Sequence, residues 1–252
     1  MKKLFMTLGT CLMAALMIVS CQDNNKPDNK DKNKDNNNDV EEEALITIDG
    51  KFTDWADAPK VVESYLPDGA TKVSVLALKV TSDKDKIYIY FEQELEEGQD
   101  VSPFDFFLNT DGNDETGAST YLWQDAGWDY LIESEDGLLG SATTVRDMDD
   151  MNIYKFIGPD GADGWDDPDE SDDNYAPYQE LLDNSGFAAS AGVVENGIAK
   201  VEVSVERSVF PELAKKIKVG ILLYEGDSWA DNGLLPQEEE GALCPMMSVE
   251  LE

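Results

Sequence analysis

The clearest pattern along the chain is a period of two in its apolar side chains. In residues 87–92, Ile87, Ile89 and Phe91 fall on one face, and phenolic or charged side chains fall on the other. This alternation is typical of a half-buried β-strand. Valines alternate with charged and polar residues over 198–205 in the same way. Similar short runs predict further strands at Leu45–Ile48, Val73–Val80, Phe104–Asn109, Trp128–Glu133, Ile153–Ile157, Val193–Val194, Val219–Tyr224 and Ser248–Leu251.

Turn residues separate these runs. Asn196-Gly197 lies between two β-like runs, and an Asn-Gly pair supplies the positive φ angles of a type I′ hairpin. Only Val209–Lys216 has a helical pattern, with Ser208 as N-cap and Pro211 in the first turn. Roughly ten short strands at this spacing predict an all-β fold, a two-sheet antiparallel β-sandwich.

The first residues have the pattern of an exported protein. Lys2 and Lys3 precede an apolar stretch, Leu4–Val19, and Ser20 leads into Cys21. This order is typical of a secretory signal peptide, and the stretch falls short of the ~20 apolar residues of a membrane-spanning helix. Ile-Val-Ser-Cys resembles the bacterial lipobox, which implies that Cys21 is lipidated and becomes the first residue. Several acyl chains would anchor the protein firmly.

Residues 22–39 contain only Gln, Asp, Asn, Lys and Pro. A segment with no apolar side chain to bury is expected to be a solvated tether. We therefore predict a signal peptide at 1–20, a lipidated cysteine and disordered tether at 21–43, and one β-sandwich domain at 44–252. The tether resembles the acidic post-cysteine region of surface-exposed lipoproteins in Bacteroidetes. That resemblance implies an outer-membrane lipoprotein exposed on the cell surface, and a periplasm-facing lipoprotein is the alternative.

Composition excludes several kinds of site. The 252 residues include no histidine, so a Ser-His-Asp or Cys-His nucleophile and an imidazole zinc site are impossible. The formal net charge of -35 repels nucleic-acid phosphates and anionic lipids. We therefore expect no nucleic-acid partner and contact with the membrane only through the lipid anchor. Cys11 would leave with the signal peptide and Cys21 would be lipidated, so Cys244 alone remains. We expect it to be buried without a disulfide.

Residues 108–117 place oxygen-bearing side chains around a glycine directly after a predicted strand. Calcium takes six to eight oxygen ligands, so this loop predicts a structural calcium site. Asp111 and Asn113 are the first candidate ligands, and Asn109, Asp114 and Asp129 are the candidates that would complete the shell. The spacing matches only part of an EF-hand loop. The alternative is a solvated turn in which these side chains bond the backbone.

Aromatic side chains near the polar loops form the second candidate site. Sugar rings stack their C–H faces on indoles and phenols, and carboxylates accept hydrogen bonds from sugar hydroxyls. Two long loops stand out, 110–127 and the acidic 158–184. Trp55 and Trp128 lie in or beside strand-like runs, so we expect them to be structural. The sugar-binding candidates are Trp165, Trp123, Trp229 and Tyr175.

Four segments carry a resemblance to a known family. They are Ile48–Trp55 (Ile-Asp-Gly-Lys-Phe-Thr-Asp-Trp), the strand 87–91, residues 109–133 and residues 220–236. Together they resemble family 9 carbohydrate-binding modules and their DOMON-like relatives across most of Ala44–Glu252. The resemblance implies a β-sandwich with structural calcium, a saccharide held between two tryptophans, and no catalytic activity.

These features predict a surface-anchored, non-catalytic lipoprotein that binds a polysaccharide or oligosaccharide through aromatic loop residues and is stabilised by calcium. The alternative is a structural or adhesive cell-surface protein with protein partners and no sugar site. A glycosidase is a third interpretation, since abundant carboxylates could include an acid–base pair. Haem binding, known in some DOMON-like domains, would have only Met and Lys as ligands here.

Overall fold

The computed structural model describes residues 44–68, 74–134, 151–165, 178–182, 188–225, 230–238 and 242–252. Residues from Glu43 onward form one compact unit. Cys21, the tether, Tyr175 and Trp229 lie outside the described residues, so the expectations about them stay predictions. Within the described ranges, no helix has the length and apolar character needed to span a bilayer.

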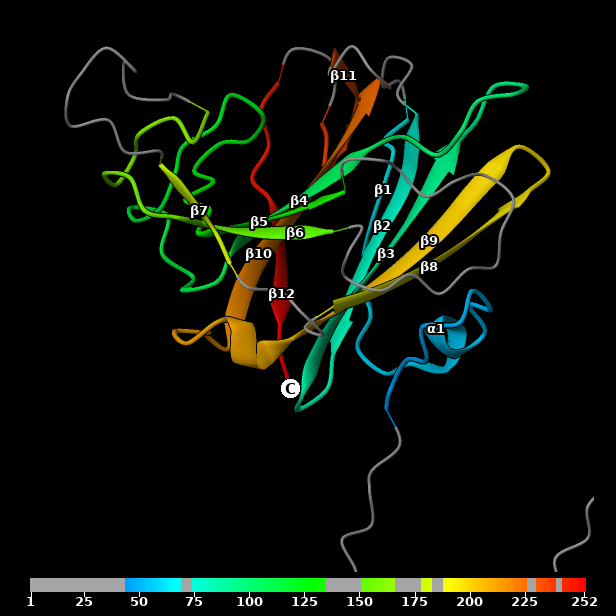
Figure 1. Ribbon diagram of the computed structural model, residues 1–252, viewed down its shortest axis with the longest axis horizontal. Coiled ribbons are helices and arrows are strands. Elements are labelled where there is room, and N and C mark those ends of the chain that lie inside the picture. Colours follow the sequence, from blue (N-terminus) through cyan, green and yellow to red (C-terminus); the bar gives the residue numbers. More distant parts are fainter. Residues whose placement is uncertain are drawn as a thin grey trace, which may run out of the picture. The chain divides into compact units, whose positions relative to one another are not determined.

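Two antiparallel sheets make up the fold, as predicted (Figure 1). The first sheet has the strand order β1-β2-β3-β9-β8, and the second has the order β11-β10-β4-β5-β6-β7, with β12 beside β10. The first sheet consists of β1 (Val62–Tyr65), β2 (Val75–Ser82), β3 (Lys86–Glu94), β8 (Ala188–Glu195) and β9 (Ile198–Glu206). The second consists of β4 (Phe104–Asn109), β5 (Tyr130–Ser134), β6 (Asn152–Phe156), β7 (Gln179–Leu181), β10 (Lys216–Glu225), β11 (Ala230–Leu235) and β12 (Met247–Glu250).

The central core fills the space between the sheets. Ile87, Ile89 and Phe91 of β3 are fully buried in it, which confirms the face predicted by the alternation. Phe104 and Phe106 of β4 approach from the second sheet, and their ring centroids lie 5.0 and 6.0 Å from that of Phe91. Apolar burial from both sheets is therefore what holds the sandwich together.

The hairpin between β8 and β9 is also confirmed. Glu195 pairs with Ile198, so the loop has two residues, Asn196 and Gly197, with φ angles of 53° and 79°. Both values are positive, as a type I′ turn requires. Cys244 is a free, buried cysteine close to β12, as expected.

Two local predictions were wrong. Val209–Lys216 is not a helix: a 3-10 turn spans Arg207–Val209, and Lys216 begins β10. The buried ring of Phe210 packs on Tyr130 at 4.9 Å, so a tertiary contact overrides the local helical signal. Leu45–Ile48 is not a strand either. The short helix α1 (Asp54–Asp57) and the strands β1, β7 and β11 were not predicted.

The segment around α1 covers the outer face of the first sheet. Ile46 and Trp55 pack against Tyr88 and Tyr90, which are 1% and 4% exposed. The tyrosine face of β3 was expected to be half-buried, and this segment buries it instead. Residues 45–48 therefore contribute by packing on a sheet rather than by joining it.

Candidate functional site

A second apolar cluster lies on the outer face of the second sheet. Phe107 of β4 and Leu131 of β5 point away from the central core, because alternate residues of a strand face opposite sides. Residues 110–128 and 157–165 cover these side chains, and we call the two segments the outer layer. Both predicted functional loops contribute to it.

Backbone hydrogen bonds join the two segments of the outer layer. The Gly161 amide donates to the Gly117 carbonyl, and the Ser119 amide donates to the Ala162 carbonyl, each at 2.8 Å. Ser119 and Asp163 also form a parallel bridge. The tertiary structure thus brings together loops that are about forty residues apart in sequence and holds them in a fixed relation.

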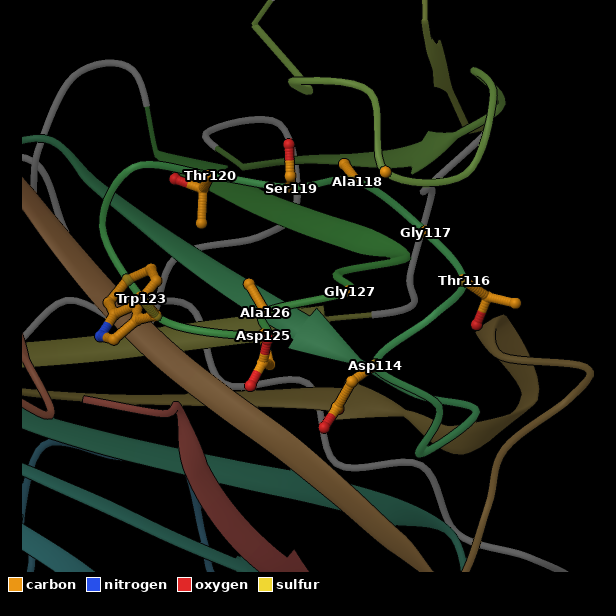
Figure 2. Close-up of a pocket in the computed structure, with 11 residues that line it drawn as sticks. Asp114, Thr116, Gly117, Ala118, Ser119, Thr120, Trp123, Asp125, Ala126 and Gly127 are labelled. Carbon is orange, nitrogen blue, oxygen red and sulfur yellow. The ribbon is translucent and has the colours of Figure 1, made fainter. Parts of the chain in front are cut away.

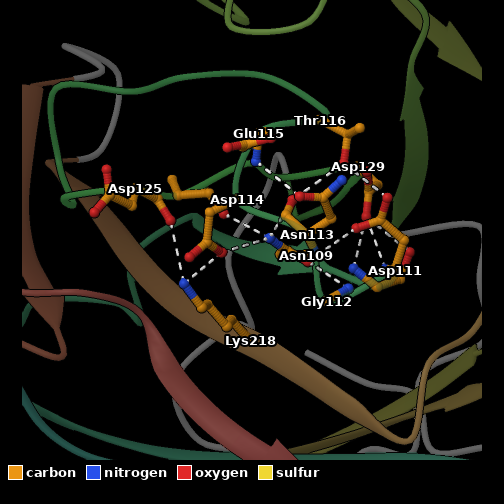
Figure 3. A network of polar contacts seen from close by, with 12 residues as sticks. Asn109, Asp111, Gly112, Asn113, Asp114, Glu115, Thr116, Asp125, Asp129 and Lys218 are labelled. Carbon is orange, nitrogen blue, oxygen red and sulfur yellow. Dashed lines mark hydrogen bonds and ion pairs between the residues drawn. The ribbon is translucent and has the colours of Figure 1, made fainter.

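The predicted calcium ligands form a network of backbone contacts (Figure 3). Asp129 Oδ2 accepts hydrogen bonds from the Thr110 amide at 2.7 Å, the Thr110 hydroxyl at 3.0 Å and the Asp111 amide at 3.2 Å. Asn109 Oδ1 accepts from the Gly112 amide at 2.8 Å. Burial raises the pKa of Asp129 despite these bonds.

The other candidate ligands are also engaged. Asp111 accepts from the Asn113 amide and the Thr116 hydroxyl, each at 2.7 Å, and Asn113 Oδ1 accepts from the Glu115 amide at 3.1 Å. Asp114 pairs with Lys218 at 2.5 Å. Among the described residues, no three Asp, Glu or Cys side chains are placed to hold a metal ion together. In this structure the side chains of the loop bond its backbone, as in a hydrogen-bonded turn, and the calcium site stays a prediction.

Trp123 and Trp165 differ sharply in exposure. Trp123 is 2% exposed, packs on Phe107 at 5.3 Å and donates its indole N–H to the Pro236 carbonyl at 2.9 Å. It therefore presents no open face on which a sugar could stack. Trp165 is 39% exposed, and its ring centroid lies 6.0 Å from that of Phe107. Trp128 and Trp55 are buried, as predicted.

Sequence reasoning missed an exposed aromatic side chain in the outer layer. Tyr121 is 59% exposed, and its hydroxyl donates to Asp231 Oδ2 at 3.1 Å. Burial, followed by the charge of Asp231, raises the pKa of Tyr121 to about 12, and Asp163 adds a smaller charge effect. Asp163 also accepts a hydrogen bond from the Trp165 amide at 3.0 Å. We call Trp165, Tyr121, Asp163 and Asp231 the aromatic platform.

A buried acid–phenol pair lies on the same face of the second sheet. Asp105, two residues before Phe107 on β4, is 1% exposed and accepts a hydrogen bond from the Tyr224 hydroxyl at 2.6 Å. Its other oxygen has no hydrogen-bond partner among the described residues. Burial raises the pKa of Asp105 to about 8, and the nearby Glu133 acts in the same direction. No substrate can reach a carboxyl group this deeply buried.

A small pocket opens within the outer layer (Figure 2). It has a volume of about 180 Å³ and is lined by Asp114, Thr116, Ser119, Thr120, Trp123 and Asp125, together with small residues. The chain runs along both sides of it between Asp114 and Gly127. Its lining residues Ser119 and Thr120 directly precede Tyr121 in the sequence, so the pocket adjoins the aromatic platform.

Comparison with known proteins gives a structural similarity. No family profile and no curated protein sequence matches the chain. Among solved structures, the chain is similar to a family 9 carbohydrate-binding module from Caldicellulosiruptor kristjanssonii in complex with glucose. The two share 14% sequence identity over 75% of this chain and 78% of the other, with a TM-score of 0.37. The β-sandwich assignment itself rests on the strands of this chain.

Proposed function

We propose that this protein is a non-catalytic glycan-binding lipoprotein, and that its aromatic platform is the binding surface. The observation that carries the proposal is a set of two exposed aromatic rings and two carboxylates, three of them from the outer layer and one, Asp231, from β11. Trp165 and Tyr121 offer ring faces to the C–H faces of a sugar. Asp163 and Asp231 offer acceptors for its hydroxyl groups.

The platform is held in place before any ligand binds. Trp165 rests on the buried ring of Phe107, and Tyr121 is tied to Asp231 by its hydroxyl. A rigid site loses little conformational entropy on binding. Such preorganisation is expected of a binding surface and is unnecessary for an ordinary solvent-exposed loop.

The absence of catalysis is part of the proposal. Acid–base hydrolysis of a glycosidic bond needs two carboxyl groups that both reach the scissile bond. Asp105 has a strongly raised pKa, which a general acid needs, but it is 1% exposed. Binding alone is the function that this geometry supports.

The sequence around Cys21 supports a membrane anchor. We propose that the lipidated cysteine and the tether hold the sandwich near the outer membrane, where it meets polysaccharide outside the cell. Metabolic labelling with a fatty-acid analogue tests this step. The Cys21→Ser variant should lose both the label and its recovery in the membrane fraction.

Glycan binding is tested with the purified full-length protein in mild detergent and a panel of oligosaccharides. We expect saturable binding to one sugar class, and a loss of about fivefold in affinity in Trp165→Ala, because stacking of a sugar on an exposed indole is worth on the order of 1 kcal/mol. Tyr65→Ala is the matched control, since Tyr65 is 51% exposed on β1 in the first sheet.

The adhesive alternative makes a different prediction in the same experiment. If no oligosaccharide binds, or if Trp165→Ala and Tyr65→Ala bind as well as the unaltered protein, the platform is not a sugar site. The structural or adhesive interpretation would then be preferred, with a protein partner in place of the glycan.

A further inference from the structure

The pocket in the outer layer has the dimensions of a site for one small ring. Its volume of about 180 Å³ is many times the ~10–15 Å³ that one water molecule needs by the same measure. The pocket can therefore admit a small polar ring. It lies beside the platform residue Tyr121, since Ser119 and Thr120 line it (Figure 2).

Backbone hydrogen bonds and one lysine hold the walls of the pocket in place. Ala118 and Trp128 exchange backbone hydrogen bonds of 2.9 and 3.1 Å, and Gly161 donates to Gly117 at 2.8 Å. The ammonium group of Lys218 contacts Asp114 Oδ1 at 2.5 Å and donates to the Asp125 carbonyl at 3.3 Å, so it links two lining residues (Figure 3). The pocket therefore exists before a ligand enters it.

The lining carries two carboxylates, those of Asp114 and Asp125, together with hydroxyl groups. Ionised carboxylates only accept hydrogen bonds. The Thr116 hydroxyl already donates to Asp111 Oδ2 at 2.7 Å, and the ammonium group of Lys218 is engaged by Asp114. A ligand with hydroxyl or amino groups would bring the donors that these carboxylates accept.

We propose that this pocket is a second sugar subsite, which takes one ring of the glycan and selects it by charge. The carboxylates of Asp114 and Asp125 outnumber the single lysine beside them, so an amino sugar or a neutral sugar is favoured. A uronic acid would place its own carboxylate against Asp125 and is disfavoured by like-charge repulsion. The inference deepens the proposed function and rests on it.

Three monosaccharides that differ in one substituent test the charge selection. Glucosamine, glucose and glucuronic acid are titrated into the full-length protein by calorimetry. We expect glucosamine to bind most tightly, glucose more weakly and glucuronic acid not measurably. In Asp125→Asn, glucosamine should lose about three- to fivefold in affinity, the range of one exposed charge contact, while glucose changes by less than about twofold. Asn is a conservative choice because Asp125 has a φ of 50°, which Asn tolerates.

A pocket-filling variant tests the location. Ser119→Leu places an apolar side chain into the pocket and should abolish binding of all three monosaccharides. Tyr65→Ala, a change on β1 of the first sheet, should leave monosaccharide binding unchanged. Thermal melts check that each variant folds. If Ser119→Leu does not fold, Asp125→Asn still tests the subsite.

The two proposals fail in different ways. If a folded Ser119→Leu protein binds every sugar normally, while Trp165→Ala still weakens oligosaccharides, the subsite is overturned and the platform stands. If glucuronic acid binds as well as glucosamine, the charge selection is overturned. If oligosaccharide binding does not depend on Trp165, the platform fails, and monosaccharide binding that depends on Asp125 would still support the subsite.

Discussion

Trp55 donates its indole N–H to Glu202 Oε2 at 2.9 Å, although the two residues are 147 positions apart. Glu202 is a fully buried residue of β9. Its other oxygen accepts hydrogen bonds from the amides of Asp49 and Gly50 at 2.9 and 2.7 Å. One carboxylate therefore holds both ends of the segment Asp49–Trp55 against the first sheet. This contact gives the Asp-Gly and Asp-Trp pairs of that segment a structural role.

Removing the indole donor should destabilise the domain. Trp55→Phe keeps an aromatic ring against Tyr90 but leaves Glu202 Oε2 buried without its partner, and we expect a loss of about 1–3 kcal/mol in the free energy of unfolding. Urea denaturation measures it. Trp165→Phe is the control, because exchanging one aromatic ring for another at an exposed position should change the free energy of unfolding by less than about 0.5 kcal/mol. Equal stability of the two variants would contradict the assigned role of Glu202.

The buried carboxyl group of Asp105 should make stability depend on pH. Burial raises its pKa from 3.8 to about 8 in the folded protein, so the folded state holds a proton that the unfolded state releases between these values. The contribution of Asp105 is therefore complete below about pH 4 and is lost as the pH rises through about 8. Within this window, one proton changes the unfolding free energy by about 1.4 kcal/mol per pH unit.

Asp105→Asn removes the titrating group and keeps an acceptor for the Tyr224 hydroxyl. Its unfolding free energy should vary less with pH than that of the unaltered protein, with the largest relative gain at the alkaline end. Denaturant titrations at several pH values provide the comparison. Parallel pH profiles for the two proteins would show that Asp105 is ionised in the folded state.

The position of Trp165 depends on the glycine before it. A Cβ at Gly164 would lie 1.9 Å from Trp128 Cζ2, so Gly164→Ala must push the chain off that ring. We expect a loss of about 1–3 kcal/mol from overpacking, accompanied by weaker oligosaccharide binding. Unfolding and calorimetry on the same variant measure both effects.

Gly98→Ala is the matched control for this substitution. Gly98 has a φ of 83° and no atom within 4 Å of an added Cβ, so alanine there costs about 1–2 kcal/mol of backbone strain without touching Trp128. Binding should survive in Gly98→Ala at temperatures where both variants are folded. If Gly164→Ala binds the glycan equally well, close packing on Trp128 is not what positions Trp165.

The loop with the predicted calcium ligands should be stabilised by its hydrogen bonds even without metal. Asp129→Asn weakens an acceptor that serves three donors, and we expect a loss of about 1–3 kcal/mol in the presence of EDTA. Glu115→Gln, a change at an exposed position of the same loop, is the control.

Thermal melts with EDTA and with calcium then address the metal directly. A ligand that binds only the folded protein raises the melting midpoint, so the calcium prediction requires a rise that Asp111→Asn diminishes. If Asp129→Asn is destabilised only when calcium is present, the carboxylate serves the ion and not the turn.

The strands that alternate most strictly could be predicted from the sequence, because their side chains face a core on one side. This holds for β3, β9 and the Asn196-Gly197 turn. Short edge strands such as β1 and β7 carry too little pattern to stand out, since their pairing partners decide whether they form. The helix expected at Val209–Lys216 failed because Phe210 is anchored on Tyr130, which no local signal indicates.

The candidate site shows the same division. The sequence by itself determined that an acidic chain without histidine has aromatic residues in polar loops, and this composition limits the chemistry available to it. Only the tertiary structure decided which rings are exposed. Trp123 and Trp165 look alike in sequence, yet the outer layer buries the first against Phe107 and Gly220 and leaves the second open. Burial depends on contacts between distant segments, so it is set by the fold and not by the local pattern.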